Sequence, residues 1–195
     1  MNYIKDIQEY LALEAKILAQ LDVKQIDAAL NLLDETRQRK GRIYICGNGG
    51  SAATASHFQN DFNKGVSEYI EVPFRFHCLN DNVATLMAIA NDIGYEEVFR
   101  FQLRGVMEPG DILVAISGSG NSKNVLNAVE YAKAQGCQVI GVTGFTGGRL
   151  KELCDVSLHA PVMSMQVTED IHMIFDHLMM SVFYRHLCGK EHLKG

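Results

Sequence analysis

Histidine and acidic side chains occur in two groups whose spacing suits proton transfer or metal binding. His57 and Asp61 are four residues apart, so on a helix both lie on one face. The second group is the segment EDIHMIFDH, which contains Glu169, Asp170, His172, Asp176 and His177. Imidazole titrates near neutral pH, and histidine with carboxylate oxygens can bind zinc. A His/Asp pair alone also occurs as an ordinary surface ion pair, and His172 has a helix-surface position as its alternative.

Two clusters of small residues suit a different chemistry, the binding of a phosphate. GNGGSA provides Asn48, Gly49 and Ser51, and SGSGNS provides Ser117, Gly118, Ser119 and Ser122. Glycines let backbone N–H groups approach an anion, and a helix that follows presents unpaired N–H groups. Neither cluster completes a dinucleotide-binding or P-loop motif. The alternative for either one is a tight turn that caps a helix.

The elements that must position these residues follow from the apolar pattern. Two helices are expected within residues 3–40, with Asp22 as the N-cap of the second. Beyond them, strand-like runs alternate with helical stretches. The runs cover 42–47, 74–80, 111–117, 137–144 and 156–161, and the helices 50–64, 82–107, 122–135, 146–153 and 168–187. This alternation predicts an α/β fold with a doubly wound, five-stranded parallel sheet flanked by helices. Both small-residue clusters then follow strands, where such sheets bind ligands.

Composition narrows the class of protein. The 195 residues are 47% hydrophobic, and a net charge of −5 argues against nucleic acid as the main partner. We interpret the basic run at 37–42 as a solvated helix end. Five scattered cysteines without a CxxC pair favour reduced thiols and a cytoplasmic location. The apolar runs are shorter than the roughly 20 residues of a membrane helix, so no membrane partner is expected.

Four segments together carry a family resemblance: CGNGGSAATASHF, NDIGYEEVF, ISGSGNSKNV and TEDIHMIFDH. They resemble the sugar isomerase (SIS) domain family and, within it, the phosphoheptose isomerase branch. The likeness covers nearly the whole chain, so we expect one SIS domain over residues 1–195. It also implies a sugar phosphate ligand and a homotetramer with sites between subunits. The helical pair within residues 1–40 is expected to serve in this oligomerisation.

The resemblance implies an aldose–ketose isomerase that converts sedoheptulose 7-phosphate to D-glycero-D-manno-heptose 7-phosphate through an enediol. Such a reaction needs a base, an acid and a group that stabilises the oxyanion. Carried onto this chain, the family's zinc ligands fall on His57, Asp61, Glu169 and His177. Two of these differ from the family, which has Glu at the position of Asp61 and Gln at that of Glu169. Zinc is therefore an expectation that depends on two altered ligands.

The resemblance also gives catalytic and sugar-binding positions. Asp61, Glu169 and His177 are the expected catalytic residues, and a further acidic position of the family falls on Gln166. Asn91 and Asp92 are expected near the sugar, with a helix C-cap as their alternative. The phosphate is assigned to the two small-residue clusters, where Ser119 and Ser122 bind it and Ser51 assists.

A geometric difficulty accompanies the zinc expectation. Glu169 and His177 on one continuous helix would be about 12 Å apart along its axis, too far to share one ion. Either the helix begins later, or different subunits provide the ligands, or no metal is bound. The altered positions also keep a rival class open, a non-catalytic module for sugar phosphate binding or assembly.

Overall fold

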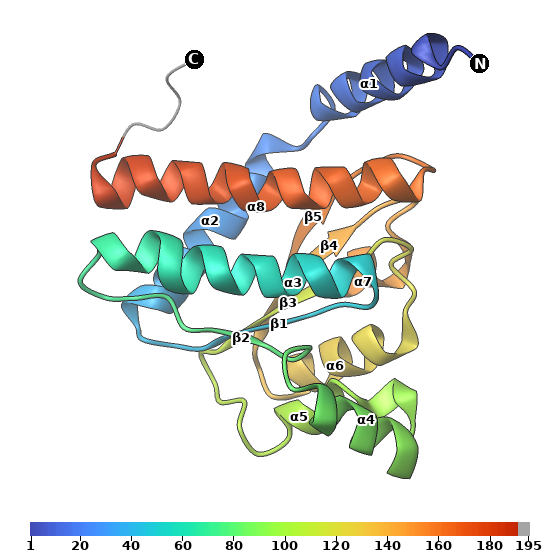
Figure 1. Cartoon of the computed structure of the whole chain (residues 1–195). Coiled ribbons are helices and arrows are strands. Elements are labelled where there is room, and N and C mark those ends of the chain that lie inside the picture. Colours follow the sequence, from blue (N-terminus) through green and yellow to red (C-terminus); the bar gives the residue numbers. More distant parts are fainter. Residues whose placement is uncertain (191–195) are drawn as a thin grey trace.

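A computed structural model describes residues 1–190, and Figure 1 shows a central sheet between two layers of helices. All five strands are parallel, in the order β2-β1-β3-β4-β5. The strands are β1 (Ile43–Cys46), β2 (Phe76–Cys78), β3 (Ile112–Ser117), β4 (Gln138–Thr143) and β5 (Val156–His159). The predicted doubly wound, five-stranded parallel sheet is confirmed.

The strands form where apolar residues follow one another without alternation. Every residue of β1 and β3 is buried, as expected for central strands with helices on both faces. Successive side chains enter different cores: Ile43 and Ile45 pack in one, while Tyr44 packs in the other. The sheet thus separates two apolar layers and fixes where its helices lie.

The helices that cover the sheet agree in most cases with the pattern of the sequence. Their bounds are α1 (Ile4–Leu18), α2 (Val23–Gln38), α3 (Gly50–Asn60), α4 (Val83–Asp92), α5 (Arg100–Leu103), α6 (Lys123–Ala134), α7 (Gly148–Leu153) and α8 (Met165–Cys188). Helices α2, α3 and α8 lie on one face, and α4, α5 and α6 lie on the other (Figure 1). A π-helical segment, Asp61–Val66, continues α3.

The expected single helix over 82–107 is wrong. The structure divides it into α4, a short 3₁₀ turn (Tyr95–Glu97) and α5. Ile93 leaves helical geometry, and Gly94 adopts φ +144°, a conformation that residues with a side chain rarely reach. The break therefore occurs at the glycine, where the backbone has this freedom.

The two N-terminal helices have different surroundings. Asp22 caps α2 as predicted, accepting hydrogen bonds from the backbone N–H groups of Lys24 (2.9 Å) and Gln25 (3.3 Å). Helix α2 packs into the core of its own chain through residues that include Ala29 and Leu33. Helix α1 projects from the body of the molecule (Figure 1), and Ile17 is its one buried residue. Within residues 1–190, no helix combines the length and apolarity needed to cross a bilayer.

Candidate active site

The two small-residue clusters meet at the carboxyl edge of the sheet. β1 and β3 are neighbours, although they are far apart in sequence, and the chain leaves them toward opposite edges of the sheet. Ligands of doubly wound sheets bind at such a point, where the strand order reverses. The loop after β1 leads into α3, and the loop after β3 leads into α6. The structure thus brings together two loops that are far apart in the sequence.

Polar side chains from three segments support the first loop. Asn48 donates a hydrogen bond from its amide to Asn124 Oδ1 (2.8 Å), and Asn124 donates one back to Asn48 Oδ1 (2.9 Å). The Tyr95 hydroxyl also donates to Asn48 Oδ1, at 2.7 Å. Gly49 adopts φ +55° at the N-cap of α3, and Ser51 is buried in its first turn. These contacts fix the loop against α6 and the segment after α4.

Hydroxyl groups line the second loop. The Ser117 hydroxyl, which is buried, donates a hydrogen bond to Ser122 Oγ at 3.1 Å. Ser119 Oγ accepts one from the backbone N–H two residues later. Gly120 has φ +67° and lies so close to the Gly147 carbonyl that a Cβ atom would meet its oxygen at 1.9 Å. The loop therefore depends on glycine at that position.

The first turns of α8 lie over both loops. A Cβ atom on Gly118 would meet Met165 Sδ at 2.8 Å, and one on Gly50 would meet Glu169 Oε1 at 2.3 Å. The Glu169 carboxylate therefore sits at the N-terminus of α3, where unpaired N–H groups and the helix dipole favour a negative charge. This is the kind of position a bound phosphate also prefers.

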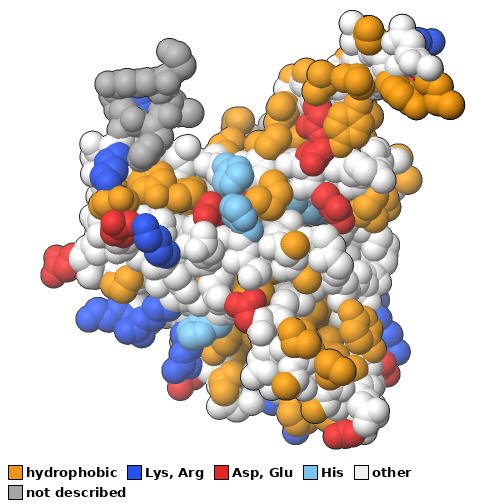
Figure 2. All heavy atoms as spheres, in the orientation of Figure 1, with side chains coloured by type: hydrophobic (Ala, Val, Ile, Leu, Met, Phe, Trp, Pro, Cys, Tyr) orange, Lys and Arg blue, Asp and Glu red, His pale blue; other side chains and the backbone are white. Residues whose placement is uncertain are grey.

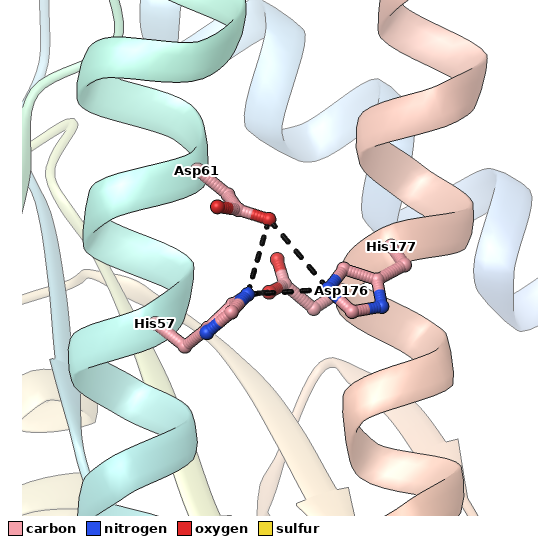
Figure 3. Close-up of side chains that lie close together, drawn as sticks. All are labelled: His57, Asp61, Asp176 and His177. Carbon is pink, nitrogen blue, oxygen red and sulfur yellow. Dashed lines mark hydrogen bonds and ion pairs between the residues drawn. The ribbon is translucent and has the colours of Figure 1, made fainter. Parts of the chain in front are cut away.

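Farther along the same two helices, a His/Asp cluster forms from His57, Asp61, Asp176 and His177 (Figure 3). Its ligand atoms all lie within 4.8 Å of one another. His57 Nε2 is 3.1 Å from His177 Nε2 and 3.3 Å from Asp61 Oδ2. The distances are 3.8 Å from His177 Nε2 to Asp61 Oδ2 and from His57 Nε2 to Asp176 Oδ2. One pair comes from α3 and its π-helical continuation, and the other from α8.

The cluster is open to solvent on its histidine side and closed on its aspartate side. The side chains of His57 and His177 are 42% and 58% exposed, whereas those of Asp61 and Asp176 are 11% and 0% exposed. Figure 2 shows His side chains at the surface near the middle of this face. Burial, with a smaller contribution from Asp61, raises the pKa of Asp176 to about 8. Both of its carboxylate oxygens are buried without a hydrogen-bond partner.

These features fit a bound metal ion. Zinc binds nitrogen and oxygen ligands at about 2.0–2.2 Å in a tetrahedron, which places ligand atoms roughly 3.3 Å apart. The observed separations between ligand atoms are 3.1 to 3.8 Å where measured. A buried carboxylate without a hydrogen bond is costly unless a cation compensates it. The donor set and its spacing therefore suit zinc.

Comparison with known proteins gives the family. The family model for the SIS domain matches residues 2–144. Phosphoheptose isomerase of Aliarcobacter butzleri is 36% identical over 179 residues, which are 90% of this chain and 94% of that protein. Phosphoheptose isomerase of Helicobacter pylori is 36% identical over 199 residues, covering 97% and 98%. The chain belongs to the phosphoheptose isomerase family. It is thus an isomerase of the SIS fold, as its resemblance indicated.

Solved structures agree with this assignment. Phosphoheptose isomerase from Neisseria gonorrhoeae superposes with a TM-score of 0.86 at 29% identity, covering 94% of this chain and all of that one. The predicted family and fold are therefore confirmed.

Not all of the expected metal ligands come together within the chain. Helix α8 is continuous, and Glu169 is outside the His/Asp cluster of its own chain, as the 12 Å estimate anticipated. Asp176, which was noted but not assigned a role, takes the fourth place instead. His172 is not on the helix surface; it is 1% exposed. Gln166 is exposed in the first turn of α8.

The loop expected near the sugar lies at the C-terminal end of α4. Asn91 and Asp92 are exposed at the C-terminal end of α4, where the Asn91 amide donates to Asp92 Oδ1 at 2.8 Å. Tyr95 is the residue of this segment that reaches the first loop. The sequence assigned no role to Tyr95 or Asn124, although both lie in segments that carry the family resemblance, because their contacts join segments far apart in the chain.

Proposed function

We propose that this chain interconverts sedoheptulose 7-phosphate and D-glycero-D-manno-heptose 7-phosphate. The observation that carries the proposal is the His/Asp cluster on the same helix that begins at the phosphate-type loop. Gly50 and His57 are seven residues apart on α3, hence about 10 Å along its axis. That separation favours a long, extended sugar phosphate over a short one.

The phosphate end of the substrate is assigned to the loops after β1 and β3. Ser119 and Ser122 donate hydroxyl hydrogen bonds to it, and Ser51 assists from the start of α3. Backbone N–H groups at the two helix N-termini add the electrostatic attraction. Glu169 points into the same region, so it is expected to contact a substrate hydroxyl rather than the phosphate, which its charge repels.

Proton transfer is assigned to His177 and Asp61. In the ketose-to-aldose direction, a base removes a proton from C1, the enediol forms, and a proton is returned to C2 while the hydroxyl proton moves from O1 to O2. The exposed imidazole of His177 suits the first role, since an imidazole nitrogen can accept a proton. Asp61 lies within 3.8 Å of it and suits the transfer between oxygens.

We further propose that His57, Asp61, Asp176 and His177 hold a zinc ion. Zinc bound there would stabilise negative charge that develops on the substrate oxygens. An imidazole nitrogen that binds a metal cannot also accept a proton. If zinc were bound there, His177 would serve as a ligand, and the proton-transfer role would fall to the Asp61 carboxylate.

The test is turnover of sedoheptulose 7-phosphate by the purified chain, together with zinc content and chelator treatment. His177→Ala should abolish turnover in either version and leave sugar phosphate binding largely intact, while the matched variant His186→Ala, on the exposed end of α8, retains both. Stoichiometric zinc and loss of activity to a chelator support the metal site. Parental turnover by His177→Ala would refute the assignment, and binding without turnover in the parent would favour the non-catalytic module.

Self-association as a homotetramer is proposed from α1. Its exposed face carries Ile4, Ile7 and Leu11 at helical spacing, with 60%, 56% and 61% of each side chain exposed. A second copy of the chain is the partner that would cover this face. Ile7→Glu with Leu11→Glu should reduce the assembly seen by light scattering. If the protein without these substitutions were a monomer at micromolar concentration, the proposal would be contradicted.

We also infer a cytoplasmic location, since all five cysteines are free thiols, the state a reducing compartment maintains.

A further inference from the structure

The basic run at 37–42 is not simply a solvated helix end. Arg37 is 9% exposed, donates to Asp34 Oδ1 from two guanidinium nitrogens and to the Val72 carbonyl, and so belongs to the body of the protein. The rest of the run, Arg39 to Arg42, lines a pocket of about 200 Å³. That volume is several times the roughly 30 Å³ a water molecule occupies in the liquid.

The pocket lies at the amino edge of the sheet, away from the candidate active site. Arg42 immediately precedes β1, Arg75 precedes β2, and Asp111 precedes β3. The chain therefore brings cations to one place from segments more than thirty residues apart. Figure 2 shows Lys and Arg side chains gathered at the lower left, on the side where α2 ends in Figure 1.

Closely packed backbone forms the floor of the pocket. A Cβ atom on Gly41 would meet the Gly110 carbonyl oxygen at 2.8 Å, so the two segments touch there. Lys40 adopts φ +61° at the end of α2, and Gly41 N–H closes the helix by donating to the Thr36 carbonyl at 2.9 Å. Glycine is the usual residue at the left-handed position of this motif. A lysine there places an ammonium beside the pocket at a conformational cost that glycine would not incur.

Neutral groups hold the guanidinium groups in position. Arg39 Nε donates to the Gly110 carbonyl at 2.8 Å, and Arg75 Nη1 donates to the Lys40 carbonyl at 3.0 Å. Arg42 Nη1 donates to the Val106 carbonyl at 2.8 Å. Carbonyl partners orient these cations without cancelling their charge. Because the side chains are already ordered, little conformational entropy is lost when an anion binds.

Two carboxylates line the pocket, and both have other partners. Asp111 is buried and accepts hydrogen bonds from the backbone N–H groups of Arg42 (2.7 Å) and Glu108 (2.9 Å). The side chain of Glu108 is 73% exposed and 3.8 Å from Arg42 Nη1, a surface pair of little strength. Within residues 1–190, both ion pairs of the pocket are made by Arg42. Among the residues that line the pocket, four cations and two carboxylates give a formal excess of two positive charges.

The positive field extends to a neighbouring side chain. The pKa of His77, which lies in β2 two residues after Arg75, is lowered by burial first and then by the charge of Arg42; the charge of Asp111 raises it in part, and that of Arg75 lowers it further. Excess positive charge at this edge contrasts with the whole chain, whose net charge is −5. Local clustering of this kind attracts anions even on an acidic protein.

We propose that this pocket is a second anion site, separate from the candidate active site, which binds a small phosphate-class anion with at least two negative charges. Arg39 and Arg75 donate from oriented guanidinium groups, and Lys40, which also lines the pocket, contributes an ammonium. Such groups recognise phosphate oxygens through charge-assisted hydrogen bonds.

The experiment titrates inorganic pyrophosphate into the full-length protein at low ionic strength, where screening is weak. All variants are made in a Ser119→Ala background, which weakens the binding of pyrophosphate by the loop after β3. Lys40→Gln with Arg75→Gln should weaken pyrophosphate binding at least about tenfold, as expected when charge-assisted hydrogen bonds are lost. Lys5→Gln with Lys24→Gln removes the same charge from exposed sites elsewhere and should leave the affinity unchanged.

Three results separate this pocket from the active site. Parental affinity in the Lys40/Arg75 variant would overturn the inference, and so would complete loss of pyrophosphate binding in Ser119→Ala alone. In a parental background, the Lys40/Arg75 variant should turn over sedoheptulose 7-phosphate at the parental rate; joint loss of turnover and binding would place the pocket in the active site instead. If the parent has no turnover, the proposed function fails while the titration still decides the pocket.

Discussion

The burial of His172 leads to a prediction about acid stability. The free-energy cost of protonating its ring in the folded protein can be worked out from its surroundings. The ring is 1% exposed, and neither nitrogen has a hydrogen-bond partner that meets geometric criteria. Burial lowers the pKa of His172 from 6.5 to about 4, and a backbone interaction with Thr143 offsets this only in part. The imidazole of His172 therefore binds a proton more weakly in the folded protein than in the unfolded chain.

The sign and size follow from proton linkage. Well above pH 6.5 the ring is neutral in both states and has no effect on the pH dependence of stability. As pH falls from 6.5 to about 4, the unfolded state binds the proton first, so the free energy of unfolding decreases. Each pKa unit corresponds to about 1.4 kcal/mol, so the full loss is about 3 kcal/mol, and between 2 and 3 kcal/mol of it, roughly, is reached by pH 4.5.

Replacement by leucine should remove this loss. His172→Leu fills a similar space without polar atoms, so it leaves no buried group unsatisfied. We expect its free energy of unfolding in urea to fall less than that of the parent between pH 7.5 and 4.5, by about 2 kcal/mol. Chelator in all samples removes any metal contribution, and protein concentration is kept fixed because assembly affects apparent stability.

The exposed His186 supplies the control, since His186→Leu should keep the parental pH dependence. Equal acid destabilisation in His172→Leu and the parent would refute the reasoning, because it would mean that the buried ring is protonated in the folded state at no cost.

The remaining predictions concern the active site. Asp176→Asn should lower the zinc content measured by atomic absorption, because it removes an anionic ligand, whereas Glu169→Gln should leave it unchanged; the reverse order would mean that the zinc site lies between subunits. Ser119→Ala should weaken sugar phosphate binding by roughly tenfold or more in calorimetry, the cost of one hydrogen bond to a charged group, and an unchanged affinity would remove this serine from the site. Gly120→Ala should destabilise the protein in urea unfolding, since its Cβ would meet a carbonyl oxygen; parental stability would contradict that contact.

Much of the architecture could be read from the sequence because it depends on local pattern. Continuous apolar runs predicted buried parallel strands, and glycines and serines after two of them predicted anion-binding loops. His57 and Asp61 were found as a pair because their spacing of four residues has meaning on any helix. Helix geometry likewise sets the distance between Glu169 and His177 on one helix, and this distance argues against their binding the same ion.

Other features depend on which helix faces which, and pattern does not determine that. Asp176 enters the His/Asp cluster because α8 lies beside α3 in one register, and a different register would have placed another carboxylate there. Tyr95 and Asn124 meet Asn48 only after three segments pack together. The cations around Arg75 converge because three strands begin at one edge of the sheet. The sequence by itself determined the strands, the loops and the kinds of ligand they suit, since these follow from periodicity and backbone freedom. Only the tertiary structure decided which side chains share a site, since that depends on long-range packing.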